Sequence, residues 1–156
     1  MRSIFVAVVA AAALWLGLAA AAQACPVITT GVQSYSASAS ELARPAGINL
    51  VAGGNYNLGN CYNAPGHGYV ISQPDISLYY NRDVSGRALE IRTAGNCDTV
   101  LLVNTGAANW YFDDDDGNGL NARIRLSSPS AGRYDIWVGT YGASTCNTQL
   151  VFETFR

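Results

Sequence analysis

The sequence predicts an all-β fold, a single antiparallel β-sandwich in which two sheets enclose one core. After residue 24, the apolar residues come in short runs separated by Gly, Asn, Asp and Pro, which is typical of strands and turns. Several of these runs alternate apolar and polar residues, as strands buried on one face do. No long amphipathic helical pattern appears, so the crossover helices of a parallel α/β sheet are missing.

Residues 1–24 are typical of an export signal, with Arg2 at the start, an apolar stretch over residues 4–18, and Ala-Gln-Ala as a cleavage site at 22–24. An uncleaved membrane anchor and a lipoprotein attached through Cys25 are the alternatives. The alanine-rich stretch and the cleavage site favour a cleaved signal. We therefore expect a secreted or periplasmic protein with no membrane span after cleavage and one domain over residues 25–156.

Charge also narrows the class of partner. Without Arg2, eight arginines and no lysine stand against eleven acidic residues, and this weakly acidic balance argues against nucleic acid. An exposed sandwich edge could support a dimer, yet no residue demands one, so we expect a monomer.

Four cysteines lie far apart in the chain, without the paired C-x-x-C spacing of a structural zinc site. In an exported protein they should form two disulfides. Three pairings are open, and we favour the one in which each bond links one half of the domain. That choice joins Cys25 to Cys61 and Cys97 to Cys146.

Strands are expected at 48–52, 69–72, 76–80, 88–93, 99–104, 109–112, 122–127, 134–141 and 149–153. Residues 99–104 are apolar almost throughout, which predicts a central strand covered on both faces. The small polar segment 34–46 is expected to be an extended surface stretch. The Gly- and Asn-rich segment 53–67 is expected to be a long loop that a disulfide through Cys61 keeps ordered.

Two strands show the alternation of a half-buried sheet. In residues 88–93, Leu89 and Ile91 are expected to face the core while Glu90 and Arg92 face water. The segment 122–126 repeats this pattern with two apolar and two arginine side chains.

The most distinctive motif is a run of four aspartates, Asp113, Asp114, Asp115 and Asp116, followed by Gly-Asn-Gly. Part of the calcium-loop pattern D-x-[DN]-x-[DN]-G is met, by Asp114, Asp116, Asn118 and Gly119. The twelfth position is Arg125 instead of a bidentate glutamate, and no helical pattern flanks the loop, which argues against an EF-hand. The sequence predicts a calcium loop between two strands, and a solvated acidic turn is the alternative.

From Cys97 onward the chain carries a more specific pattern: CDTVLLV at 97–103, NWYF at 109–112 before the aspartates, NARI at 121–124 and GRYDIWVGTY at 132–141. This resembles the bacterial pre-peptidase C-terminal domain, whose motifs are D-T-x-L-x-L, an acidic loop, N-x-x-I and G-x-Y-x-I-x-V-G-x-Y. The upstream segment 68–80 matches only loosely.

The resemblance implies a jelly-roll-like β-sandwich, usually appended to secreted peptidases and related to the collagen-binding domains of clostridial collagenases. Calcium can stabilise such domains, which bind or assist and do not cleave. By position, the resemblance implies that the calcium neighbourhood is Asp98, the aspartates 113–116 and Asn121. No peptidase accompanies the domain in this chain, which leaves its role beside an enzyme open.

An enzyme is the competing class of function. His67, the one histidine, could serve a small hydrolase or peptidase, with Asp75 nearby in sequence. No G-x-S-x-G elbow occurs, and cysteines held in disulfides are inert. A lone histidine in a glycine-rich turn is more typical of a structural or exposed side chain.

Aromatic residues near the aspartates could form a binding surface. Trp110 and Tyr111 would suit a glycan or peptide ligand if exposed, whereas a buried Trp110 would be a core residue. We expect Trp137 to be buried, and Tyr134 and Tyr141 to have packing roles.

Taken together, these features predict a secreted, non-catalytic binding or accessory module. It would be stabilised by calcium and would contact a polysaccharide, a peptide or another component of the cell envelope. The alternatives are a hydrolase that uses His67 and a purely structural envelope protein without a metal.

Overall fold

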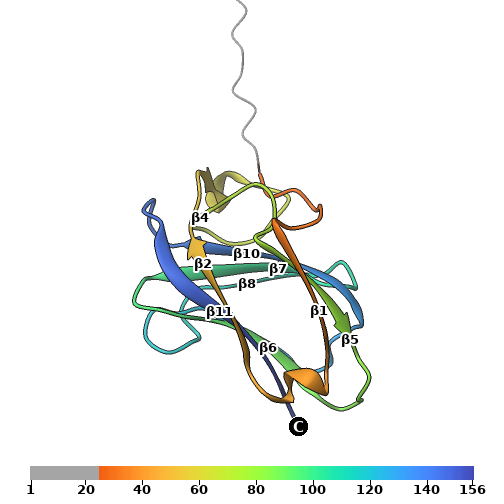
Figure 1. Ribbon diagram of the computed structural model, residues 1–156. Helices are drawn as coiled ribbons and strands as arrows, with labels where there is room; N and C mark the ends of the chain where they lie inside the picture. Colours follow the sequence, from red (N-terminus) through yellow and green to blue (C-terminus); the bar gives the residue numbers. More distant parts are fainter. Residues whose placement is uncertain (1–24) are drawn as a thin grey trace, which may run out of the picture.

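The computed structural model describes residues 25–156. The predicted export signal lies outside the described residues. Within residues 25–156, no helix is long and apolar enough to cross a membrane. Strands dominate this part of the chain (Figure 1).

The strands form two sheets, as predicted. Sheet A has β10 at its centre. On one side β10 pairs with β7, which pairs with β8; on the other it pairs with β5, which pairs with β1. Beyond the end of β5, β10 pairs with β4, which pairs with β3. Sheet B has the order β2-β11-β6-β9. The elements in chain order are β1 (Gln33–Ser38), η1 (Glu41–Ala43), β2 (Ala46–Ala52), β3 (Tyr56–Asn57), η2 (Leu58–Asn60), β4 (Tyr69–Val70), β5 (Ile76–Asn81), β6 (Ala88–Ala94), β7 (Thr99–Asn104), β8 (Trp110–Asp113), β9 (Arg123–Leu126), β10 (Gly132–Thr140) and β11 (Cys146–Phe155).

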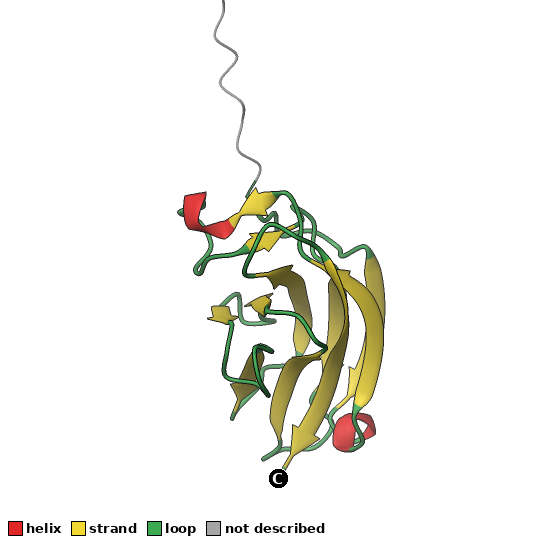
Figure 2. Cartoon of the chain, turned by 90° about the vertical axis from the view of Figure 1, so that its left-hand side faces the viewer, coloured by secondary structure: helices red, strands yellow, loops and turns green. Residues whose placement is uncertain are grey.

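The main core lies between the sheets and is made by alternate side chains of their inner faces. Leu89 and Ile91 of β6 face it, as predicted, and both are fully buried. Leu42 of η1 also belongs to this core. Figure 2 shows η1 at the end of the molecule that carries the C-terminus and η2 at the end where residue 25 begins.

A second, smaller core covers the outer face of sheet A. Val100 and Leu102 of β7 and Trp137 of β10 are fully buried there beneath Leu58 and Ala64 of the 53–67 loop. The prediction that β7 is covered on both faces is therefore confirmed. The burial predicted for Trp137 is also confirmed.

Both predicted disulfides are present, Cys25–Cys61 and Cys97–Cys146. The first attaches the 53–67 loop, which carries η2, to the start of the described chain. The second joins the segment before β7 in sheet A to the first residue of β11 in sheet B. The second bond thus links the two sheets covalently.

The expectation of an extended surface stretch over residues 34–46 is confirmed for residues 34–38, although these form a strand that was not predicted, and it was wrong for η1, whose Leu42 is buried. Residues Gln33–Ser38 form β1, which pairs with β5 in parallel from Gln33↔Ile76 to Ser38↔Asn81. The remaining strand pairs are antiparallel. β1 is an edge strand exposed over most of its length, and its small polar residues do not show the apolar run of a buried strand.

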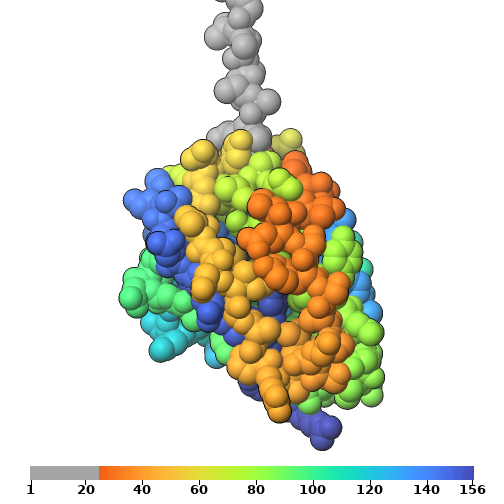
Figure 3. All heavy atoms as spheres, in the orientation of Figure 1, coloured from red at the N-terminus to blue at the C-terminus, as the bar shows by residue number. Residues whose placement is uncertain are grey.

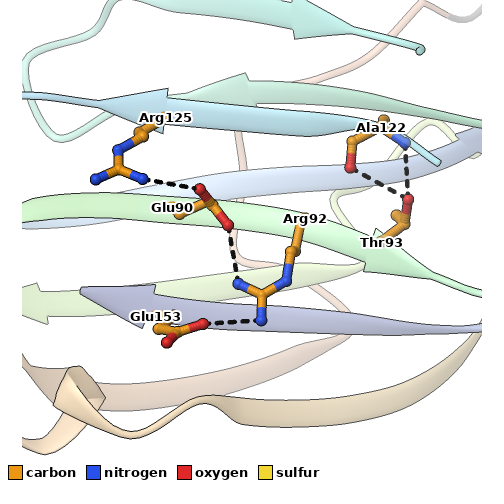
Figure 4. A network of polar contacts seen from close by, with 6 residues as sticks. All are labelled: Glu90, Arg92, Thr93, Ala122, Arg125 and Glu153. Carbon is orange, nitrogen blue, oxygen red and sulfur yellow. Dashed lines mark hydrogen bonds and ion pairs between the residues drawn. The ribbon is translucent and has the colours of Figure 1, made fainter. Parts of the chain in front are cut away.

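The prediction that Glu90 faces water was also wrong. Glu90 is 5% exposed, because two arginines lie across it on the outer face of sheet B (Figure 4). Arg92 Nη1 lies 2.9 Å from Glu90 Oε1 and Arg125 Nη1 lies 3.4 Å from Oε2, while Arg92 Nη2 also pairs with Glu153 at 2.8 Å. The alternation in residues 123–126 is confirmed, with both arginines exposed.

Candidate functional site

The acidic run meets the only histidine of the chain, although 47 residues separate them. His67 Nε2 lies 2.7 Å from Asp114 Oδ2. His67 sits between Gly66 (φ +100°) and Gly68 (φ +91°), and these two glycines have a backbone conformation that other residues rarely adopt. A Cβ atom on Gly66 would lie 2.1 Å from the Phe112 ring. The glycines on either side of His67 thus let its loop pack tightly against β8.

Two aromatic rings hold the imidazole in place. The centroid of the His67 ring lies 5.1 Å from that of Phe112 and 5.2 Å from that of Tyr141. Tyr141 is 55% exposed, and the contact of its ring with His67 is the packing that the structure shows for it. By contrast, Tyr134 is fully buried and its hydroxyl donates to Ser130 O.

Asp98 lies beside Tyr141, Asp114 and Asp115. Its backbone carbonyl accepts from Tyr141 N at 3.1 Å, and its Oδ1 is buried without a hydrogen-bond partner. Burial raises the pKa of Asp98, and the nearby charges of Asp115 and Asp114 raise it further, while His67 acts in the opposite direction. We call His67, Asp98, Asp114, Asp115 and Tyr141 the acidic-aromatic face.

Two of the predicted calcium ligands serve the backbone instead. Asp113 Oδ2 accepts from Arg123 N at 2.7 Å and from Asp116 N at 3.2 Å. Burial raises the pKa of Asp113, against the effect of these two bonds. Asn121 accepts from Gly95 N at 3.0 Å, and its amide donates to Gly95 O and to Asn118 O. These side chains fix the shape of the loop.

The predicted calcium set therefore does not converge as a whole. In the part of the chain that the structure describes, no group of three His, Cys, Asp or Glu side chains has the geometry to hold a metal ion. Asp116 and Asn118 are exposed. Among the predicted ligands, Asp98 has a buried Oδ1 without a hydrogen-bond partner, and the charges of Asp115 and Asp114 lie close enough to raise its pKa.

The carboxylates of the acidic-aromatic face have no arginine partner among residues 25–156. The ion pairs that arginines make lie elsewhere, on Glu90, Glu153 and Asp135. The only cationic group paired here is the imidazole of His67 if it is protonated. The face thus carries negative charge that the protein itself leaves largely uncompensated.

Trp110 and Tyr111 do not form one binding platform. Trp110 is partly buried in the second core, with its ring 5.5 Å from that of Trp137. Tyr111, 40% exposed, points the other way and lines a hollow of about 320 Å³ with Arg125 and Tyr134. Successive side chains of β8 must face opposite sides of the sheet, which excludes a joint role.

The hydrolase arrangement suggested by the sequence is not assembled among the described residues. Asp75 Oδ2 accepts from Val138 N at 2.8 Å, whereas the hydrogen bond of His67 goes to Asp114. No serine or threonine hydroxyl is hydrogen-bonded to His67 in this part of the chain. The geometry is that of a hydrogen-bonded pair on the surface.

Comparisons with known proteins leave the family open. No family model matches the chain, and no curated protein matches it. Among solved structures, a chain described as PliG of Aeromonas hydrophila, a periplasmic lysozyme inhibitor of g-type lysozyme, aligns over 81% of this chain and 100% of its own, at 12% identity and a TM-score of 0.46.

Proposed function

We propose that this protein is an exported, non-catalytic binding protein whose acidic-aromatic face binds a positively charged polypeptide of the cell envelope. One observation carries the proposal: Asp98, Asp114 and Asp115 lie together beside exposed Tyr141 without an arginine to neutralise them.

The chemistry of this face suits a protein partner. Tyrosine is enriched at protein interfaces because it offers a large apolar ring with a polar end. Uncompensated carboxylates attract a basic partner and fix its orientation, an effect that weakens with added salt. The polysaccharide predicted as an alternative ligand would not use this excess of negative charge.

The proposal predicts that removing charge from this face weakens binding to a cationic probe. We expect Asp114→Asn/Asp115→Asn to weaken binding to a lysine oligopeptide on the order of tenfold, measured by calorimetry at low salt. Asp83→Asn/Glu41→Gln removes two charges from another part of the surface, where both carboxylates bond serines, and serves as the control. Equal weakening by both pairs would contradict the proposal, since it would show attraction to net charge alone.

The unpartnered Oδ1 of Asp98 supports calcium as a second candidate ligand of the same face. Asp114 and Asp115 would have to move toward Asp98 to hold the ion, because no three such side chains converge among the described residues, and the ion would supply the missing positive charge. An ion that binds only the folded state at one hundred times its dissociation constant stabilises by about 2.7 kcal/mol.

Thermal unfolding tests this candidate. We expect excess calcium to raise the melting temperature relative to a chelator, and Asp98→Asn to abolish the difference. Asp83→Asn should retain it. A melting temperature that is the same with calcium and with chelator would contradict calcium binding and leave the aspartates free for a cationic partner.

A further inference from the structure

A second surface lies far from the acidic run in sequence, where the sandwich is open between its edge strands β1 and β2. Each of these strands pairs with only one neighbour, β5 and β11 respectively. A hollow of about 560 Å³ runs between them. Figure 3 looks onto this face, with β1 in orange and β2 in yellow-orange. We call this hollow the edge groove.

The rim of the edge groove is apolar and exposed. Val32 beside β1 is 62% exposed and Val51 of β2 is 54% exposed. Val27 and Ile28 are also exposed, at 50% and 55%, and their segment runs along residues 72–74, which lead into the groove. Exposed apolar residues gathered around a hollow mark a site of interaction with another molecule.

Asp75 is the one charged residue that lines the edge groove. It lies where the partner of β10 changes from β5, paired up to Ile76↔Ile136, to β4, paired at Tyr69↔Thr140. In this gap, Val138 N donates to Asp75 Oδ2 at 2.8 Å. This bond fixes the carboxyl group in the wall of the groove.

The charge of Asp75 has no partner within the described residues, because the ion pairs of the protein involve other carboxylates. Burial raises the pKa of Asp75 to about 7, although hydrogen bonds from the Val138 amide and its own amide act in the opposite direction. A cation placed against the second carboxyl oxygen would relieve this cost. The edge groove therefore combines an apolar rim with one carboxyl group, that of Asp75, which would bind a cationic group.

We infer that the edge groove binds an extended, apolar segment of a partner protein that carries one arginine or lysine, whose cationic group pairs with Asp75. The apolar side chains of the segment contact Val32 and Val51, and the charge complementarity at Asp75 fixes its register. This surface is independent of the acidic-aromatic face, so either assignment can stand without the other.

The probe for this inference is a pair of blocked peptides, acetyl-Val-Arg-Val-amide and its citrulline analogue, which has nearly the same shape but no charge. NMR titration of the oxidised protein should show shifts at the residues of the edge groove, with the arginine peptide binding at least tenfold more tightly. Asp75→Asn should remove this preference. Val32→Ser/Val51→Ser should weaken both peptides and keep the preference.

The wild-type protein offers a check that does not depend on a variant folding. The pKa of Asp75, followed by carboxyl carbon NMR, should fall when the arginine peptide is added and stay unchanged with the citrulline peptide. Equal binding of both peptides, or an unchanged pKa at saturation with the arginine peptide, would overturn the inference. Weakening by Asp114→Asn/Asp115→Asn, with Asp75→Asn binding like the wild type, would also overturn it, because the peptide would then bind the acidic-aromatic face.

Discussion

Asp75→Asn is expected to raise the free energy of unfolding at pH 8 and to leave it nearly unchanged at pH 3. The asparagine carbonyl can still accept the hydrogen bond that Val138 N donates to Asp75, so the change removes the charge and keeps the contact. The pKa of Asp75 is raised from 3.8 to about 7 by burial. At 1.36 kcal/mol per pKa unit, the charged carboxyl lowers stability at pH 8 by at most about 4 kcal/mol.

The direction follows from proton binding. Between about pH 4 and pH 7 the folded protein holds a proton on Asp75 that the unfolded chain has released. Stability from this group therefore falls as the pH rises through that window and is constant below it. In Asp75→Asn this decline should be absent.

Urea unfolding of both proteins at pH 3, 5 and 8 measures the effect. The difference between variant and wild type should be smallest at pH 3 and largest at pH 8. Asp83→Asn is the control, since Ser40 lowers the pKa of Asp83 and its loss should not stabilise the fold at pH 8. A difference between Asp75→Asn and wild type that does not change with pH would contradict the raised pKa.

Replacing Cys25 and Cys61 with serine is expected to be the most destabilising of the changes considered. The bond closes a loop with a sequence separation of 36 residues, for which the chain-entropy model gives about 3–4 kcal/mol. It also attaches the 53–67 loop, which carries Leu58 and Ala64, over the second core. Without this attachment the outer face of β7 and β10 would be more open to water.

Fluorescence reports this effect directly, because Trp110 and Trp137 are the two tryptophans after residue 24 and both lie in the second core. The variant should unfold at lower urea, and its emission should shift to the red before the loss of strand signal in circular dichroism. Wild type treated with a mild reductant should move toward the same behaviour. An unchanged midpoint would show that packing alone holds the loop.

The central strand β7 could be predicted from its apolar composition. Residues 99–104 must be covered on both faces, since a run of apolar side chains cannot face water on either side, and β7 is buried throughout. One disulfide pairing could be favoured over the others, although all three possible pairings are compatible with the same sequence. The structure confirms the favoured one.

The predictions that failed concerned features that depend on contacts between segments distant in the sequence. β1 is small and polar, and only its parallel pairing with β5 makes it a strand. Glu90 follows the period of a solvent-facing residue, yet Arg125 from another strand helps to cover it. Local sequence contains neither fact.

In the candidate site, too, some features could be predicted from the sequence and others depend on the fold. The aspartate run was conspicuous, but whether each carboxylate is free depends on the fold: Asp113 bonds two backbone amides while Asp114 reaches His67. The sequence suggests Asp75 only as a residue near His67 along the chain, whereas its hydrogen bond with Val138 follows from the gap between β5 and β4.

The place of β11 has a consequence for the timing of folding. In sheet B this strand is the partner of both β2 and β6, and its pairing with β2 joins residues about one hundred positions apart, from Cys146↔Ala52 to Phe152↔Ala46. Contacts between such distant segments form slowly, and none of those in sheet B that involve β11 can form until the last strand has left the ribosome. Sheet B can thus be completed only at the end of synthesis, and until then β2 has no strand to pair with.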